Sequence, residues 1–259
     1  MEKLQSLLYR VYWFLERHIV PGAESSQNRY ARIVRRYVTP GTRWLDVGCG
    51  HRLWPEWIAG QEDVARRASL LVGLDPDVES VKQNPLVHHR VAGLEFPFRD
   101  GAFTLVTANM VLEHLERPLD VLTEIRRVLA PDGLCIVHTP NALYWQMRLA
   151  RRVPQRVKNA LVGVSEGRRA ADVYPAYYRL NTVHDLETLL PQAGLSADEL
   201  MLVNTSSAGT IVLLGPLVVL ELLWMRLTQR RRLRAHRTNI IGIVRPAAAR
   251  GGRARPAAA

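Results

Sequence analysis

The chain has little cysteine, and its two cysteines do not form a recognisable motif. Cys49 and Cys135 make no CxxC sequence and have none of the Cys/His spacings typical of zinc ligands. This pattern argues against a disulfide framework and against a structural zinc site, and it fits a reducing compartment.

A secretory signal peptide is also missing from the first twenty residues. Charged residues between Glu2 and Arg17 interrupt every apolar run there, and no small-residue cleavage site follows. We therefore expect a cytoplasmic protein. With 259 residues, 47% hydrophobic and 23% charged, the chain is expected to form one domain with additions around a single core.

Acidic residues are absent from residues 226–259, which contain ten arginines. A second basic segment, residues 148–169, has seven Arg or Lys residues against one acid, Glu166. Because the net charge of the whole chain is +11, the remaining residues are mildly acidic. The positive charge thus belongs to two segments, and on its own it does not predict a nucleic-acid-binding surface.

The hydrophobic pattern alternates between short apolar runs and amphipathic segments. Strands are expected over residues 42–50, 69–75, 87–93, 103–109, 133–140, 199–205 and 239–245. Helices are expected over residues 3–18, 26–38, 53–67, 118–130 and 183–194. Strands joined through helical crossovers form a parallel sheet with helices on both faces. The sequence therefore predicts a doubly wound α/β fold with a seven-stranded, mostly parallel sheet.

Four sequence segments follow one another in the first half of the chain. TRWLDVGCG, residues 42–50, is a strand with an acid before two glycines, and GLDPD ends the second strand with Asp75. LEFPFRDGAFTLVTANMVLEHLERP and LAPDGLCIVHTPN complete the series, which ends at residue 141. This order resembles class I S-adenosylmethionine-dependent methyltransferases, in particular the type 11/12-like bacterial branch that modifies small molecules, sugars and lipids.

The resemblance implies a Rossmann-like fold with S-adenosyl-L-methionine as the cofactor. Asp46 would engage the cofactor's ammonium group, and Gly48 and Gly50 would let the backbone approach its methionine moiety. Asp75 would accept hydrogen bonds from both ribose hydroxyls, because a carboxylate offers two acceptor oxygens to two adjacent donors. The chain departs from the family's first motif at Arg52, where a third glycine is expected.

The adenine-binding turn departs from the family as well. Ala92 or Gly93 stands near the position where many members have an acid for the adenine amino group. Glu95 is expected to supply that contact, or else to be a solvated loop charge. Thr104 replaces the Asp of the common FDLV sequence at a position that we interpret as structural.

The pair Glu113-His114 raises two further hypotheses. Some members of the family bind a divalent ion through an ExxEH sequence, but here Met110 occupies its first position, so that no metal site is expected. His114 is a candidate general base because histidine titrates in the physiological range. The alternative is that His114 fixes the loop after the fourth strand.

Acceptor residues are harder to identify, because the sulfonium group already activates the methyl and no side-chain nucleophile is required. Asn109 ends the fourth strand and is expected to line the cofactor or acceptor site. His138, Asn141, Tyr144 and Trp145 follow the fifth strand and are acceptor-site candidates, with helix packing as the alternative for the aromatic pair. The resemblance implies a small-molecule, glycan or lipid-linked acceptor.

The predicted elements and motifs divide the chain into five segments. They are N-terminal helices (1–40) that are expected to pack beside the cofactor domain, a cofactor-binding core (41–141), a basic lid or acceptor segment (142–180), a C-terminal part of the fold (181–247) with an apolar and basic helical insertion (206–238), and a disordered tail (248–259).

Residues 208–237 combine an apolar stretch with a run of arginines. Pro216 and Glu221 inside the stretch disfavour a membrane-spanning helix. We expect instead a helix in the interface of the inner face of the cell membrane, with Trp224 near the acyl chains. The arginines expected to meet anionic headgroups are Arg226, Arg230, Arg231, Arg232, Arg234 and Arg237. The alternative is a helix packed on the protein body or on a second subunit.

Three other functions stay open. The basic segments could serve an RNA-binding protein or an RNA methyltransferase, and the departures at Arg52 and Ala92 allow a catalytically inactive methyltransferase-like partner protein. An NAD-dependent oxidoreductase is disfavoured, because GCGHRL lacks the third glycine of the GxGxxG sequence.

Overall fold

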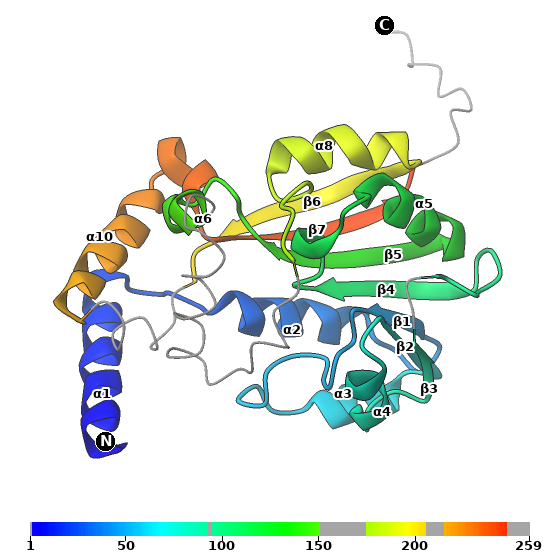
Figure 1. Ribbon diagram of the computed structural model, residues 1–259, viewed down its shortest axis with the longest axis horizontal. Helices are drawn as coiled ribbons and strands as arrows, with labels where there is room; N and C mark the ends of the chain where they lie inside the picture. The colour runs from blue at the N-terminus through cyan, green and yellow to red at the C-terminus, as the bar shows by residue number, and fades with distance from the viewer. Residues whose placement is uncertain (1, 93–94, 151–174, 206–214, 248–259) are drawn as a thin grey trace, which may run out of the picture.

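The computed structural model describes residues 2–92, 95–150, 175–205 and 215–247. Its centre is a seven-stranded sheet with the order β3-β2-β1-β4-β5-β7-β6 (Figure 1). All pairs from β3 to β5 are parallel, and β7 lies antiparallel between β5 and β6. The strands are β1 (Arg43–Val47), β2 (Leu70–Asp75), β3 (His89–Ala92), β4 (Phe103–Asn109), β5 (Leu129–Pro140), β6 (Leu195–Val203) and β7 (Asn239–Pro246). The predicted fold class is confirmed.

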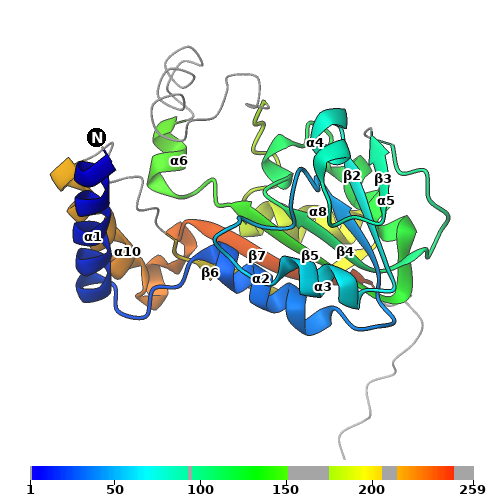
Figure 2. The same ribbon diagram turned by 90° about the horizontal axis from the view of Figure 1, so that it is seen from below.

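Helices cover both faces of this sheet (Figures 1 and 2). Apolar residues of α2 and α3 pack with one face, and those of α5 and α8 pack with the other, which gives two apolar cores with the sheet between them. The helices are α1 (Glu2–Ile19), α2 (Ser26–Tyr37), α3 (Gln61–Arg67), α4 (Val78–Gln83), α5 (Pro118–Val128), α6 (Trp145–Ala150), α8 (Val183–Gln192) and α10 (Val218–Thr228), with short 3-10 helices η1 (Leu112–His114), η3 (Gly215–Leu217) and η4 (Arg231–His236).

The helix expected over residues 53–67 is half as long in the structure and starts at Gln61. Pro55 explains part of this difference, because the residue before a proline is disfavoured in the helical conformation. Leu53, Trp54 and Ile58 are buried instead in an irregular loop, where the Trp54 indole Nε1 donates to the carbonyl of Ile58 at 3.0 Å. The loop after β1 is therefore long and anchored by apolar side chains.

The N-terminal helices separate into two roles. Helix α2 packs against the sheet as expected, whereas α1 packs against α10 and not beside the cofactor half of the domain. Tyr12 of α1 is buried with Val218, Leu222 and Met225 of α10, and the two helices stand together at one end of the molecule in both views (Figures 1 and 2). None of the helices in the described ranges is long and apolar enough to cross a membrane.

A buried polar chain links the two central strands. The Trp44 indole Nε1 of β1 donates to the Thr107 hydroxyl of β4 at 2.6 Å, and this hydroxyl donates to the Asp46 carboxylate at 2.5 Å. All three side chains are buried. One hydroxyl thus satisfies a buried donor and a buried acceptor together, and it fixes the first acidic residue of the motif against the neighbouring strand.

Replacing Thr107 by Val keeps the shape of the side chain and removes both hydrogen bonds. We expect Thr107→Val to lower the free energy of unfolding in urea by about 2–3 kcal/mol, because a buried N–H and a buried carboxylate lose their partner. Thr107→Ser keeps the hydroxyl, and we expect it to lose only about 1 kcal/mol for the missing methyl group. The exposed Thr123→Val serves as a control. Equal losses for the two Thr107 variants would contradict this role.

Candidate functional site

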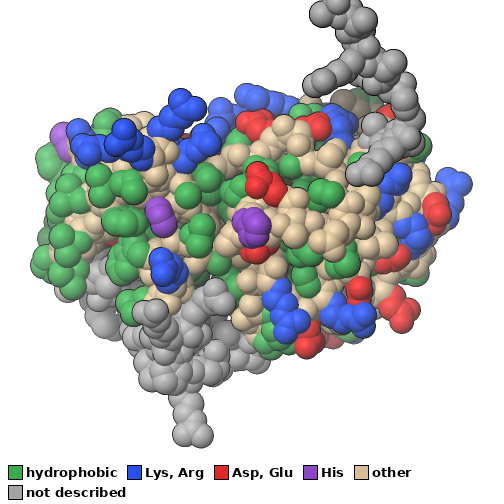
Figure 3. Space-filling model, turned by 90° about the horizontal axis from the view of Figure 1, so that it is seen from above, with side chains coloured by type: hydrophobic (Ala, Val, Ile, Leu, Met, Phe, Trp, Pro, Cys, Tyr) green, Lys and Arg blue, Asp and Glu red, His purple; other side chains and the backbone are tan. Residues whose placement is uncertain are grey.

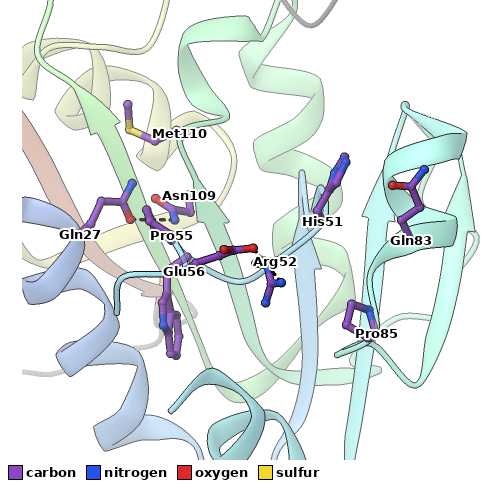
Figure 4. A pocket seen from close by; sticks show the side chains of 10 residues that line it. Gln27, His51, Arg52, Pro55, Glu56, Gln83, Pro85, Asn109 and Met110 are labelled. Atoms are coloured by element: carbon purple, nitrogen blue, oxygen red, sulfur yellow. Dashed lines mark hydrogen bonds and ion pairs between the residues drawn. The ribbon is translucent and has the colours of Figure 1, made fainter. Parts of the chain in front are cut away.

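A cavity of about 590 Å³ lies at the carboxyl ends of the parallel strands (Figure 4). The sheet order places β2 on one side of β1 and β4 on the other, and the loops that follow diverge at such a point and leave a crevice. The cavity volume is within the range of small-molecule sites. Its lining residues come from α2, the loop after β1, the end of α4 with the residues after it, and the end of β4. They are Gln27, His51, Arg52, Trp54, Pro55, Glu56, Gln83, Pro85, Asn109 and Met110.

The two motif glycines have different neighbours. Both adopt the left-handed conformation, with φ of +67° at Gly48 and +42° at Gly50. A Cβ atom on Gly48 would lie 2.3 Å from Cγ2 of Val111, so that this glycine accommodates Val111, and its contact with a cofactor stays a prediction. Around Gly50 no described heavy atom lies within 4 Å of the place of a Cβ atom. Gly50 is therefore the glycine whose backbone borders open space.

Asp75 holds the glycine loop in place. One carboxylate oxygen accepts the backbone N–H of Gly50 at 2.9 Å, and the other accepts that of Asp77 at 2.8 Å. From the opposite side, the Asn84 amide donates to the carbonyls of Cys49 and Gly50 at 3.2 and 3.0 Å. Because a carboxylate has about four acceptor positions, Asp75 retains two for a ligand with paired donors.

Asp46 lies in β1 behind the glycine loop and is 3% exposed. Burial raises the pKa of its carboxyl from 3.8 to about 7, although the hydrogen bond from Thr107 acts in the opposite direction. A carboxyl in this state gains much from a nearby cation, because a positive charge stabilises its ionised form. This property suits a residue that meets an ammonium group.

Asn109 joins three parts of the fold at the end of β4. Its amide Nδ2 donates to the Gln27 side chain of α2 at 3.0 Å and to the carbonyl of Leu53 at 3.2 Å. Its amide oxygen accepts a hydrogen bond from Nδ1 of His138 at 2.8 Å. The His138 ring stacks on Tyr30, is fully buried, and has a pKa lowered to about 3 by burial. Asn109 lines the cavity, whereas His138 is buried behind it and is not among the lining residues.

Two more acceptor candidates are also buried by packing. The Asn141 amide donates to the carbonyl of Ala235 at 2.8 Å, which ties the segment before β7 to the end of β5. The Tyr144 hydroxyl donates to the Glu221 carboxylate of α10 at 3.4 Å. These two residues connect the insertion to the sheet and are not among the residues that line the described cavity. Of the four candidates that follow β5, only Trp145 is solvent-accessible, at 37%.

His114 contacts the segment that returns to the site before α8. Its Nδ1 donates to the carbonyl of Pro175 at 2.9 Å, and the adjacent Glu113 carboxylate accepts from Thr139 at 3.0 Å. Burial raises the pKa of Glu113. Within the described ranges, no group of three or more His, Cys, Asp or Glu residues is arranged to hold a metal ion.

Several expectations fall at the limits of the described residues. Glu95 is exposed and follows residues 93–94, which lie outside the described ranges, so its contact with adenine stays a prediction. Residues 151–174 of the expected lid and the tail 248–259 also lie outside them. Thr104 accepts the backbone N–H of Arg43 at 3.1 Å, which agrees with a structural role between β1 and β4.

Some residues that line the cavity could not be predicted from the sequence. Gln27 reaches the cavity from α2, 82 positions before its partner Asn109, and Gln83 reaches it from the end of α4. Neither belongs to a motif, so no sequence signal points to them. From the sequence, Arg52 is recognised only as the residue that replaces the third glycine of the family's first motif. In the structure the Arg52 guanidinium forms an ion pair with the Glu56 carboxylate at 2.8 Å, and both side chains line the cavity (Figure 4).

Comparisons with known proteins agree with this geometry. A family model of a methyltransferase domain matches residues 23–200. The chain is 34% identical to a probable S-adenosylmethionine-dependent methyltransferase of Mycolicibacterium smegmatis, with 51% of this chain and 47% of the relative covered. It is 30% identical to a ubiquinone biosynthesis O-methyltransferase of Psychrobacter cryohalolentis (39% and 42% covered). It is 33% identical to a tRNA U34 carboxymethyltransferase of Methylococcus capsulatus (44% and 40% covered).

The matches to these three relatives thus span 40–47% of the relatives' lengths. Among solved structures, a putative methyltransferase of Bacillus halodurans is similar in fold, with a TM-score of 0.52 at 16% identity over 86% of this chain and 99% of that one. The strand order, the acids at the ends of β1 and β2 and the family match over residues 23–200 lead to one conclusion. This chain belongs to the class I S-adenosylmethionine-dependent methyltransferases.

Proposed function

We propose that the protein transfers a methyl group from S-adenosylmethionine to a small-molecule, glycan or lipid-linked acceptor. The observation that carries the proposal is the cavity at the carboxyl ends of the parallel strands, next to a glycine loop that the Asp75 carboxylate holds and that borders open space at Gly50. The chemistry of these residues fits the cofactor. Asp75 keeps acceptor positions for two ribose hydroxyls, and Asp46 offers a buried carboxyl for the ammonium group.

When bound, S-adenosylmethionine supplies a methyl group that its sulfonium leaving group already activates. The residues of the chain then have to orient the donor and to exclude water, which lowers the entropic part of the barrier. Asn109 serves orientation, because its contacts with Gln27, Leu53 and His138 fix the wall of the cavity. The proposal contains no metal step, because Met110 stands at the first position of the ExxEH pattern.

His114 is the proposed general base for an acceptor that must lose a proton. Its Nδ1 donates to the carbonyl of Pro175, which leaves Nε2 as the basic nitrogen of the neutral ring. Nε2 lies 4.0 Å from the Glu113 carboxylate. The alternative role of His114 is to fix the segment near Pro175. Replacement by Gln separates the two roles, since Gln keeps a hydrogen-bond donor and removes the base.

The acceptor class rests on the family resemblance and on the relatives. One relative is named for ubiquinone biosynthesis, which supports a lipid-linked acceptor, and another is named for a tRNA position, which keeps the RNA alternative. We favour the lipid-linked class, because the exposed apolar surface of α1 and α10 offers a contact that an RNA would not use. The inactive-partner alternative predicts that the cofactor does not bind.

The function is tested with methyl-labelled S-adenosylmethionine and a fractionated cell extract. We expect the label to enter the lipid or small-molecule fraction, and the Asp75→Ala variant to abolish the transfer because it removes both ribose contacts and the support of Gly50. Calorimetry with the cofactor checks binding independently of the acceptor. Label in RNA would favour the RNA alternative, and absence of cofactor binding would favour the inactive partner.

The raised pKa of Asp46 predicts a pH-dependent affinity for the cofactor. An ammonium group beside the carboxyl favours its charged form, so that binding lowers the pKa from about 7 and releases a proton below this pH. Affinity should therefore decrease as the pH falls through 7. Calorimetry across this range, in two buffers with different ionisation enthalpies, measures the affinity and the released protons. Asp46→Asn should bind more weakly and without this dependence, and a wild-type affinity that does not fall with pH contradicts the assignment.

Arg52 predicts a departure from the family in how the cofactor's carboxylate is held. The guanidinium lines the cavity, and we expect it to bind this carboxylate in place of its exposed partner Glu56. Arg52→Gln should weaken S-adenosylmethionine binding about tenfold. It should leave the affinity for decarboxylated S-adenosylmethionine unchanged. Arg66→Gln, which removes the exposed pair with Asp63 on α3, is the matched control. Equal losses for both ligands would assign Arg52 to loop structure instead.

A further inference from the structure

Exposed apolar side chains are concentrated at the end of the molecule formed by α1 and α10 (Figure 3). Half of the large hydrophobic side chains that the structure describes as exposed lie on these helices and the adjoining η3. Phe14 and Leu220 are 61% and 62% exposed. We call this surface the α1–α10 face; its members are Leu7, Val11, Trp13, Phe14, Leu217, Leu220 and Leu223.

Packing between the two helices does not account for these side chains. The contact uses Tyr12 of α1 and Val218, Leu222 and Met225 of α10, which are buried. Helix α10 has only two charged residues among eleven, so covering one side leaves a second apolar side exposed. A helix with apolar side chains all round is expected only where each side finds an apolar neighbour. The buried side of α10 packs against α1. The outer side of α10 is exposed among the described residues and is therefore available to a binding partner.

Cations outnumber acids on the helices that carry this face. The exposed arginines of α1, α10 and η4 are Arg10, Arg17, Arg226, Arg230, Arg231, Arg232 and Arg234. None of them forms an ion pair with a carboxylate in the described ranges, whereas Arg52, Arg66 and Arg117 of the protein body do. Helix α1 begins at Glu2 and also contains Glu16, whose pKa is raised by partial burial, and the acid of α10, Glu221, is buried. The surface is therefore apolar and positively charged.

We propose that the α1–α10 face docks on an anionic lipid surface. Leucine and aromatic side chains would enter the acyl boundary, and the arginines would meet lipid phosphates. A symmetric contact with a second copy would place these unpaired arginines against each other, which disfavours a dimer. Helix α10 has eleven residues and is about 16 Å long, about half of a bilayer's hydrocarbon core, so docking is interfacial.

This surface differs from the one expected for residues 208–237 alone. Arg237 does not belong to it, because its guanidinium donates to the carbonyls of Leu202 and Thr228 at 2.8 and 3.1 Å inside the fold. The apolar side of α10 at Leu222 and Met225 is covered by α1. In exchange, α1 contributes Trp13 and Phe14, which the earlier assignment had placed beside the cofactor domain.

The docking does not depend on methyl transfer, and it is measured with the full chain in the absence of the cofactor. The probes are vesicles of pure phosphatidylcholine and vesicles that also contain phosphatidylglycerol, in a flotation assay at low and high salt. We expect the protein to float only with the anionic vesicles, and less at high salt, since screening weakens the attraction of arginine to headgroups.

Two variants separate the apolar part from the cationic part. The apolar variant combines Phe14→Ser with Leu220→Ser and removes apolar contacts. The arginine variant combines Arg231→Gln, Arg232→Gln and Arg234→Gln and removes positive charge. Each variant should reduce vesicle binding at least about tenfold. Matched controls on the protein body are Trp57→Ser and Arg117→Gln, which are equally exposed and should bind like the wild type. Circular dichroism and cofactor calorimetry verify that each variant is folded.

Three outcomes would overturn the proposal. The first is a wild-type protein that stays at the bottom of the gradient with anionic vesicles. The second is a dimer in analytical ultracentrifugation that the Phe14→Ser/Leu220→Ser variant dissociates, since the face would then be an interface between copies. The third concerns RNA and combines two results. The arginine variant loses binding to polyuridylate while the apolar variant retains it, and neither variant changes vesicle binding. The cations would then be assigned to RNA binding.

Discussion

The reversal of strand order at β1 determines where this protein can hold a ligand. With β2 on one side and β4 on the other, the backbone leaves the sheet in two directions, and the space between the loops is open to a ligand. The two motif acids and Asn109 are placed by this arrangement. Asp46 and Asp75 lie in the two adjacent strands, and Asn109 ends the strand across the crevice. A change in the sheet order would separate them even if the sequence motifs were kept.

The site is prepared by hydrogen bonds that exist without a ligand. Asp75 holds the Gly50 loop, Asn84 supports the same loop, and Asn109 joins α2 to β4 and β5. Such contacts reduce the conformational entropy that a ligand would otherwise have to remove on binding. Asp46 is the exception, because its burial is unfavourable for the ionised form until a cation arrives. The site thus combines a fixed frame with one group whose charge state responds to the ligand.

The sequence predicted the features that depend on local patterns. The seven strands, the helices that alternate with them and the motif acids followed from apolar periodicity and from ordered segments around Asp46 and Asp75. Features that depend on contacts between distant segments could not be predicted in this way. Gln27 reaches Asn109 from another element, and the buried His138 ring stacks on Tyr30 of α2. The pairing of α1 with α10 brings together segments that are far apart in the sequence, and no local pattern contains that information.

Only residues 20–25 separate α1 from α2, and α2 carries Gln27 into the cavity wall. This short connection is held at its end by the hydrogen bond from the Ser26 backbone to Thr205. A body anchored through α1 therefore cannot tumble freely about its anchor. On the proposed lipid surface, the crevice would keep a set direction relative to that surface, and the encounter with a lipid-linked acceptor would become a search in two dimensions at a restricted angle of approach.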